Sequence, residues 1–265
     1  MRVFISADIE GTTFTTLWDE TELGHNLYAA AAKQMTAEVK AACEGAIAAG
    51  ADYILVNDAH DHAVNLDVRE LPECVEVIRG WSGSPMGMVD GVDDSFDAAM
   101  FIGYHSAAGR CGNPLSHTFT TKTTSVRLNG MVCSEFLLYS WACALRGVPT
   151  VLLSGDKMLT EDSRGLHPKL HTVAVKDGFG GSIKCLNPAL ACRKIREQAE
   201  SALKEDLSAA GISLPGEFVF EVSFKEHRDA VRRSFFPGFR LAEDRTIVME
   251  TRDFMDVLRA VQFVL

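Results

Sequence analysis

The chain has 265 residues, of which 47% are hydrophobic and 23% are charged, as is typical of a soluble globular protein. It carries 26 basic and 36 acidic residues, and the resulting net charge of −10 argues against binding to nucleic acid or to an anionic membrane surface. A chain of this length forms one large domain or two small ones with a substantial core. No apolar run reaches the roughly 18 residues that a membrane-spanning helix needs.

The start of the sequence and its cysteines indicate the compartment. Acidic residues follow the first apolar run too early for a signal peptide. Seven cysteines at irregular spacing, without a CxxC pair, do not form a disulfide framework. Cys43, Cys143 and Cys192 lie in apolar helical patterns and are expected to be buried thiols. These features predict a reducing, cytoplasmic location.

The first two thirds of the chain alternate strands with helices. A long helix is predicted up to Gly50, and another over residues 134–146. Strands, with the exit loop of the second included, are predicted over residues 2–8, 52–60, 75–80, 98–105, 149–154 and 171–175. This order predicts an α/β fold with a mostly parallel sheet flanked by helices, whose site lies at the carboxyl ends of the strands.

Two segments depart from this alternation. Residues 118–132 are rich in Thr and Val and contain Asn129-Gly130, which predicts a β hairpin beside the site. After about residue 180, a helix over 188–206 is followed by a strand-helix-strand-helix pattern. We therefore predict a catalytic α/β domain over residues 1–185 and a smaller α+β lobe over residues 186–265.

Two carboxylates, Asp8 and Glu10, stand where the first strand ends, in the stretch SADIEG. Residues one apart on a strand point the same way, so these like charges repel each other. Either water solvates the pair or a cation holds it.

Other polar residues follow the neighbouring strands. His60 ends the second strand region, His105 follows strand 98–105, His117 stands in the next segment, and Glu135 opens a helix. The mixed imidazole and carboxylate set suits zinc, and also manganese or cobalt. Its members are Asp8, Glu10, His60, His105 and Glu135.

Each of these residues, taken alone, also fits an ordinary structural role. His60 can be a loop histidine bonded to an aspartate, His105 a satisfied core histidine, and Glu135 a partner of the helix dipole. Their position at successive strand ends favours a shared cation. One Asp can bridge two metals about 3.5–4 Å apart, as two-metal hydrolases require. We expect Asn57 and Asp58 to orient His60 through its second ring nitrogen.

The remaining histidines are not expected to bind a metal. His25, His167, His171 and His227 stand in polar or irregular contexts and are predicted to lie on the surface, whereas His62 is either near the site or solvent-facing.

Five separated segments resemble one known family. They are ADIEG near the start, VNDAH at 56–60, MVDGVDDSFDAAMFIGYH at 88–105, LSHT at 115–118, and the Glu that opens the next helix. In this order and spacing they resemble the zinc-dependent D-aminopeptidases of the DppA-like type, and the likeness runs over nearly the whole chain.

The resemblance implies a dinuclear zinc site on the five residues of that set, with Asp8 bridging and Glu10 holding one ion. It implies a catalytic role for His117 as nucleophile or general base, although a neutral imidazole can equally donate to a developing oxyanion. It further implies a homodecamer whose internal chamber admits short peptides. Gly11, which lacks a Cβ, is expected to let the backbone turn tightly beside the ions.

The sequence also departs from the family pattern. Phe136 follows the last predicted ligand, and Trp18 stands after the first motif, so both are expected to reshape the substrate pocket. The predicted function is therefore a dinuclear-metal aminopeptidase or amidohydrolase that removes an N-terminal residue, a D-amino acid by resemblance, from short peptides or amino-acid amides. An L-specific aminopeptidase and an amidase for a non-peptide substrate stay open.

Two further classes of function remain at this point. A two-metal phosphoesterase would use similar ligands, but it would also need Arg or Lys to clamp phosphate, and the five motifs contain neither. A non-catalytic scaffold would keep the metal-binding site for structure alone.

Overall fold

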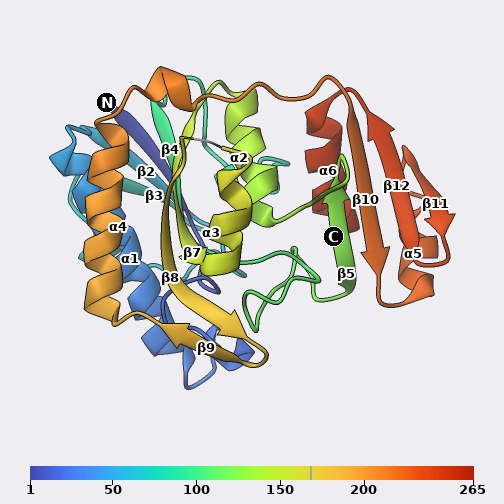
Figure 1. Cartoon of the computed structure of the whole chain (residues 1–265), viewed down its shortest axis with the longest axis horizontal. Coiled ribbons are helices and arrows are strands. Elements are labelled where there is room, and N and C mark those ends of the chain that lie inside the picture. The colour runs from blue at the N-terminus through green and yellow to red at the C-terminus, as the bar shows by residue number, and fades with distance from the viewer. Residues whose placement is uncertain (168) are drawn as a thin grey trace.

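A computed structural model of the protein describes residues 1–167 and 169–265 (Figure 1). The strands are β1 (Arg2–Ala7), β2 (Tyr53–Asp58), β3 (Val75–Ile78), β4 (Ala98–Tyr104), β5 (Thr123–Leu128), β6 (Met131–Val132), β7 (Thr150–Asp156), β8 (His171–Phe179), β9 (Ser182–Cys185), β10 (Phe218–Phe224), β11 (Phe239–Glu243) and β12 (Thr246–Thr251). The helices are α1 (Tyr28–Ala48), α2 (Glu135–Leu145), α3 (Lys157–Arg164), α4 (Pro188–Leu203), α5 (His227–Arg233) and α6 (Phe254–Val264), with short 3-10 turns η1 (Trp18–Glu20), η2 (Val68–Glu70), η3 (Gly87–Val89) and η4 (Leu207–Ala210).

The larger sheet has seven strands in the order β3-β2-β1-β4-β7-β8-β9. Its strands pair in parallel from β3 to β8, and β9 returns antiparallel to β8. Helices α1 and α4 cover one face, while α2 and α3 cover the other (Figure 1). The predicted α/β fold with a mostly parallel sheet is confirmed.

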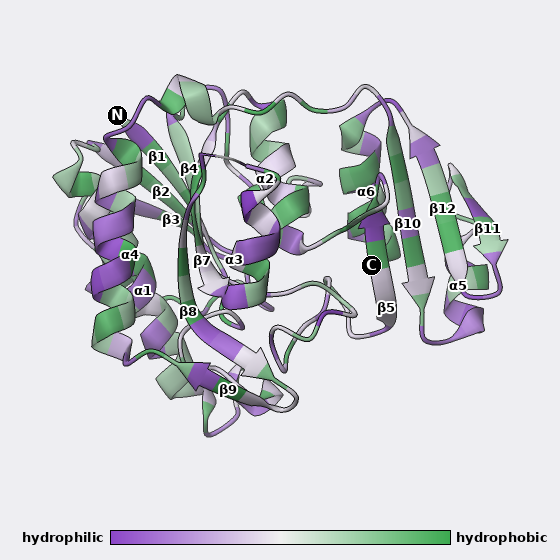
Figure 2. Ribbon diagram, in the orientation of Figure 1, coloured by the Kyte–Doolittle hydropathy of each residue, from purple (hydrophilic) through white to green (hydrophobic). Residues whose placement is uncertain are grey.

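Both faces of this sheet are buried, so the middle of each inner strand is a run of apolar residues, and polar residues follow towards the carboxyl ends. On β1, Val3 and Ile5 pack towards α1, and Phe4 packs towards α2 with Phe101 of β4. Figure 2 shows the same inner strands in the colours of hydrophobic residues, while α4 carries hydrophilic residues along its length. Parallel strands buried in this way bring their carboxyl ends to one edge.

The smaller sheet is antiparallel, with five strands in the order β11-β12-β10-β5-β6. One face of β10 is buried and packs on α6, which in turn contacts α2. Three aromatic rings close this junction, because Trp141 of α2 lies against Phe218 of β10 and Phe254 of α6 at centroid distances of 6.2 and 5.8 Å. The predicted hairpin after Thr118 is thus part of a second sheet.

The division of the chain at residue 185 stays a prediction. On its C-terminal side, α4 packs against α1 over the larger sheet. On its N-terminal side, β5 and β6 pair into the smaller sheet. Each of the two sheets therefore contains or packs against elements from both sides of residue 185.

The structure confirms some predictions about single residues and contradicts others. Cys43 and Cys143 are buried, as predicted, whereas Cys192 is half-buried. His167 is buried and bonds Ser140 at 3.1 Å, so the prediction that it lies on the surface is wrong. Within the described ranges, no helix is long and apolar enough to cross a membrane.

Candidate active site

Six side chains chosen from the sequence come together at the carboxyl edge of the larger sheet. They are Asp8, Glu10, His60, His105, His117 and Glu135. Asp8, Glu10 and His60 form one cluster, and Asp8, His105 and Glu135 form a second, each with its ligand atoms within 4.8 Å of one another. Glu10, His105 and His117 form a third such cluster. Asp8 is the carboxylate that the first two clusters share.

The turn after β1 positions Asp8 and Glu10. The Asp8 amide donates to the Ile102 carbonyl of β4 at 2.8 Å, so the residue still lies in the sheet. Two residues after Ile9, the chain presses against β4, where a Cβ on Gly11 would lie 1.8 Å from the Tyr104 carbonyl oxygen. Gly11 is thus required by this close approach of two backbones rather than by a left-handed conformation.

The loop after β2 carries His60. Asp58 clamps this loop, because its carboxylate accepts hydrogen bonds from the amides of Asn65 and Leu66 at 2.6 and 2.9 Å. Asn65 in turn donates its side-chain amide to the His60 carbonyl at 2.8 Å. The expectation that Asp58 orients the ring of His60 is therefore wrong: Asp58 fixes the backbone that carries the ring, and Asn57 bonds Gly87 instead.

The N-terminus of α2 holds Glu135 against the end of β4. Ser134 is the N-cap of this helix and accepts from the Leu137 amide at 3.1 Å. The Glu135 carboxylate accepts from the Phe119 amide at 2.7 Å through one oxygen, and its other oxygen lies 3.5 Å from His105 Nε2. The prediction that this glutamate opens a helix is confirmed.

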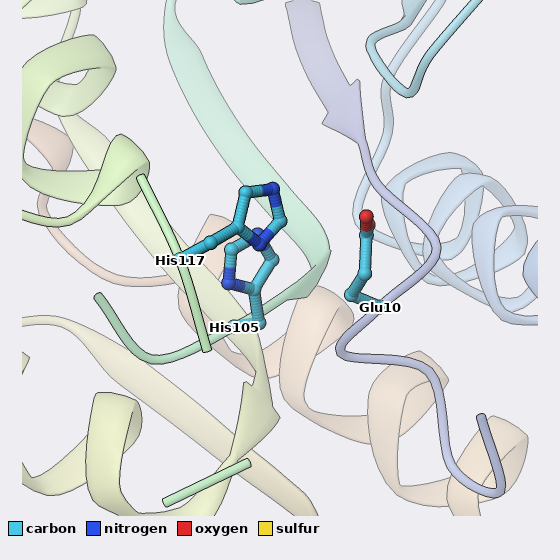
Figure 3. Close-up of side chains that lie close together, drawn as sticks. All are labelled: Glu10, His105 and His117. Atoms are coloured by element: carbon cyan, nitrogen blue, oxygen red, sulfur yellow. The ribbon is translucent and has the colours of Figure 1, made fainter. Parts of the chain in front are cut away.

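His117 lies over His105. The two rings stack at a centroid distance of 4.3 Å with planes 9° apart, and Glu10 faces them from the turn after β1 (Figure 3). Trp18 meets His117 in an edge-to-face arrangement, with the ring centroids 5.2 Å apart and the planes at 70°. His117 thus contacts both His105 of the second cluster and a tryptophan that lines the same cavity.

Backbone carbonyls select the tautomer of all three histidines. His60 Nε2 lies 2.8 Å from the Thr21 carbonyl, His105 Nδ1 lies 3.0 Å from that of Ser106, and His117 Nδ1 lies 2.8 Å from that of Leu115. A carbonyl can only accept, so each of these nitrogens carries the proton in the neutral ring. The opposite nitrogens, which face the carboxylates, keep their lone pairs, as metal-ligating histidines require.

Burial and mutual charge shift the ionisation of the cluster. Burial and then the Glu10 charge raise the pKa of Asp8 well above its ordinary value. Burial opposes protonation of His105, but the Glu135 and Asp8 carboxylates outweigh it and raise the pKa of His105 to about 10. The pKa of His60 lies above its usual range for the same reason, with Glu10 as the main opposing charge. Without a cation, His60 and His105 hold protons that compensate the carboxylates.

Three buried atoms of the cluster lack a hydrogen bond of good geometry: Asp8 Oδ2, Glu10 Oε2 and His105 Nε2. They face charged groups of the cluster itself, with Glu10 Oε2 3.0 Å from His60 Nδ1 and Asp8 Oδ2 3.5 Å from His105 Nε2. Buried polar atoms normally find a partner, so atoms left over at one point indicate a missing ligand. Carboxylate oxygens and imidazole nitrogens are donors that zinc and similar divalent ions accept. The residues at this site therefore fit a divalent cation.

A cavity of about 690 Å³ opens over the cluster. Trp18 and Trp81 line it together with the carboxylates of Glu22 and Asp61. The expectation that Trp18 shapes the pocket is confirmed. Phe136 does not line this cavity, because it points into the core and packs on Phe101 and His167.

Lys176 and Glu38 are buried ionisable residues whose role was not evident from the sequence. Lys176 lies on β8, is 3% exposed, and donates its ammonium to the carbonyls of Glu10 and Thr15. Glu38 of α1 accepts from the Thr13 amide at 2.9 Å. Both therefore hold the segment that follows β1. The sequence holds one signal for Lys176: a lysine that directly follows the apolar stretch of the predicted strand 171–175.

Comparisons with known proteins agree with this arrangement. Residues 1–263 match the model of a family described as D-aminopeptidase. A D-aminopeptidase of Bacillus subtilis (strain 168) is 29% identical over 264 residues, which are 98% of this chain and 95% of that protein. A solved structure of a Zn-dependent D-aminopeptidase, DppA from Bacillus subtilis, described as a self-compartmentalizing protease, superposes with a TM-score of 0.93 at 26% identity, covering 100% of this chain and 96% of that one.

Metal affinity should fall as the pH falls. His105, with its pKa raised to about 10, and His60 are protonated at neutral pH in the metal-free protein, so a bound cation must displace those protons. Below these pKa values the affinity should drop about tenfold per pH unit for each proton displaced. Chelator competition with zinc from pH 6 to 8.5, with calorimetry in two buffers to count released protons, measures this. An affinity that does not change with pH would contradict it.

Replacing Lys176 by Met should weaken metal binding. The substitution shortens the side chain by its terminal ammonium, leaves the Thr15 carbonyl without its donor, and removes one of the two donors to the Glu10 carbonyl, the other being Asn113. We expect zinc affinity to fall about 10- to 100-fold, as for other residues that orient ligands, and stability to fall by about 1–3 kcal/mol.

Lys157→Met is the matched control. Lys157 forms an exposed ion pair with Asp177 at 3.2 Å, so its loss should change stability by less than about 1 kcal/mol and leave zinc affinity unchanged. Equal zinc affinities in the two variants would exclude the positioning role of Lys176.

Proposed function

Because this chain belongs to the D-aminopeptidase family and is a metal-dependent aminopeptidase, we propose that five of its six clustered side chains hold two divalent ions, and that this site cleaves the N-terminal residue from short peptides or amino-acid amides. The observation that carries the proposal is that Asp8 belongs to two separate ligand clusters. One ion would take Asp8, Glu10 and His60, and the other would take Asp8, His105 and Glu135.

Zinc is the proposed metal. The solved structure of DppA is that of a Zn-dependent enzyme, and the nitrogen and oxygen donors here suit zinc, with manganese and cobalt as the alternatives. When bound, such ions polarise a scissile carbonyl and lower the pKa of water.

His117 is the proposed proton carrier. Its Nδ1 proton is engaged by the Leu115 carbonyl, so the neutral ring offers a lone pair at Nε2. Burial and then the neighbouring His105 lower the pKa of His117, which keeps the ring neutral at pH 7. The neutral ring can take a proton from the attacking water and then return it to the leaving amine. The alternative role of oxyanion donor requires a proton at Nε2, which this tautomer lacks.

The charge around the cavity favours a substrate with a free amine. Glu22 and Asp61 line the cavity beside the cluster, and no Arg or Lys lines it among the residues that the structure describes. Lys176, the buried cation behind the site, has its ammonium engaged by backbone carbonyls. An ammonium group is therefore attracted, while a phosphoester substrate would find no basic clamp.

D-stereospecificity and assembly enter the proposal by likeness to the relatives. We propose a D-amino acid at the cleaved end and a homo-oligomer, a decamer by resemblance, located in the cytoplasm. Exposed aromatic side chains such as Phe235 and Phe263, which are 82% and 69% exposed, support contacts between copies. Cys74, Cys111 and Cys185 are free and exposed, which fits a reducing compartment.

Metal content and turnover of the same variants test the dinuclear proposal. We expect two zinc ions per chain and hydrolysis of D-alaninamide in preference to L-alaninamide. Asp8→Asn should reduce the zinc content below one ion, whereas Glu10→Gln should retain one, because Asp8 is a ligand in both proposed ion sites and Glu10 in only one of them. Elemental analysis after dialysis gives the stoichiometry. Equal metal loss in both variants would count against a bridging Asp8, and faster hydrolysis of the L-amide would reverse the proposed stereospecificity.

His117→Ala should lower kcat for D-alaninamide by about 100- to 10,000-fold while the zinc content stays the same, since the ring moves protons without being one of the proposed ligands. His62→Ala is the control, because His62 is 69% exposed and bonds only its neighbour Asp61 among the described residues. Steady-state kinetics of metal-loaded protein decide the point. A His117→Ala variant as active as His62→Ala would eliminate the catalytic role.

A further inference from the structure

A second cavity of about 310 Å³ adjoins the cavity over the metal ligands. Trp81 and Phe119 line both cavities, so their side chains form the partition between them. The partition is fixed from both sides: the Trp81 indole donates to the Asp61 carbonyl, and the Phe119 ring meets Tyr139 edge-on at a centroid distance of 5.7 Å. The second cavity is thus a side compartment of the active site.

The surface of this compartment is mainly apolar. Pro85, Tyr139 and Val261 complete the walls that Trp81 and Phe119 begin. Most of the polar groups there are engaged within the protein: Asn57 donates to the Gly87 carbonyl and the Ser84 hydroxyl accepts from the Met86 amide, both at 3.1 Å, and Gln262 donates to the Gly83 carbonyl. Asp90 adds one carboxylate to the lining.

Apart from Asp90, the compartment therefore offers a ligand mainly aromatic and aliphatic surface. An apolar group that enters it would leave water and meet aromatic faces and edges.

Phe119 links the compartment to the reaction centre. Its backbone has a φ of 58°, a left-handed conformation that is costly for a residue with a bulky side chain. Two contacts hold it there: its amide donates to Glu135 at 2.7 Å, and its ring packs on Tyr139, which stands one turn after Glu135 on α2. One residue thus orients a proposed metal ligand and walls the compartment.

We propose that this compartment is the subsite for a large apolar side chain, aromatic or long aliphatic, on a substrate residue next to the cleaved bond. The inference rests on the proposed function, because it places the cleaved bond in the cavity over the ligand cluster. The preferred substrates are then amides or short peptides with such a side chain at the N-terminal residue or at the residue that follows it.

Filling the compartment tests the assignment. Ser84 lines it and is half-buried, so Ser84→Phe places a ring inside. Ser84→Ala removes the same hydrogen bond to Met86 without adding volume and is the reference variant. Ser201→Phe adds the same ring on the exposed surface of α4, away from both cavities.

The measured quantity is a ratio of kcat/KM values. D-phenylalaninamide against D-alaninamide reports on the N-terminal residue, and D-Ala-D-Phe against D-Ala-D-Ala reports on the next residue. We expect the ratio of one series to fall about 10- to 100-fold in Ser84→Phe relative to Ser84→Ala, while Ser201→Phe keeps the ratio of the unsubstituted protein. The series that responds identifies the residue. Ratios that are equal in all variants for both series would overturn the assignment.

Trp81→Ala provides an independent variant if Ser84→Phe does not fold. Trp81 is 46% exposed, so its truncation is tolerated more readily, and it removes one side of the partition. The same ratio should fall at least about fivefold. An unchanged ratio in this folded variant would also overturn the assignment.

Binding separates this inference from the proposed function. Calorimetry of D-phenylalaninamide and D-alaninamide with the zinc-loaded protein needs no turnover. Tighter binding of the phenylalanine amide that is lost in Ser84→Phe, without hydrolysis of any substrate, would leave the subsite standing and remove the proposed reaction. Hydrolysis with the same substrate ratios in every variant would leave the proposed reaction standing and remove the subsite.

Discussion

The arrangement of the site depends on the crowding of negative charge. Asp8, Glu10 and Glu135 converge on one buried point, where the low dielectric strengthens their repulsion and water is too scarce to screen it. Such a cluster is stable only with positive charge among its members. Protons on His60 and His105 provide that charge in the metal-free protein, and divalent cations would provide it in the working enzyme.

The contacts behind the cluster hold the ligands in place against that repulsion. Each histidine is tied by its far nitrogen to a backbone carbonyl, so its near nitrogen can point only at the carboxylates. Lys176 of β8 donates a hydrogen bond to the Glu10 carbonyl, and the Phe119 amide donates one to the Glu135 carboxylate. The Asp58 carboxylate accepts one from the Asn65 amide in the loop that carries His60. These supports come from different strands and loops, so protein contacts alone hold the side chains of the cluster in this arrangement.

The sequence indicated three of the clustered side chains because they follow β1, β2 and β4, which are neighbours in the larger sheet, and parallel strands end at one edge. Asp8, His60 and His105 could therefore be placed together from periodicity alone. Lys176 and Glu38 could not, because their partners are backbone groups of the turn after β1, and no local pattern shows which carbonyl a buried ammonium will meet.

The side-chain directions of a buried helix are equally hidden. Phe136 was expected in the pocket and lies in the core, because Glu135 takes the face of α2 towards the site and the next residue turns about 100° away. Two elements had local signals in the sequence but are absent from the predicted set. Gly180-Gly181 forms the turn of the β8–β9 hairpin, and Asp156 is the N-cap of α3.

The path of the chain between His117 and Glu135 has a mechanical consequence. After His117 the chain leaves the larger sheet, forms β5 and β6 of the smaller sheet, and returns to start α2 at Glu135. In the proposed holoenzyme, ions held by Asp8 and Glu135 would act as a cross-link between the end of β1 and this excursion. The two sheets would then unfold as one cooperative unit when metal is bound, and the excursion would gain freedom to fray once the metal leaves. In that holoenzyme, catalytic competence and the integrity of the smaller sheet would depend on the same bound ions.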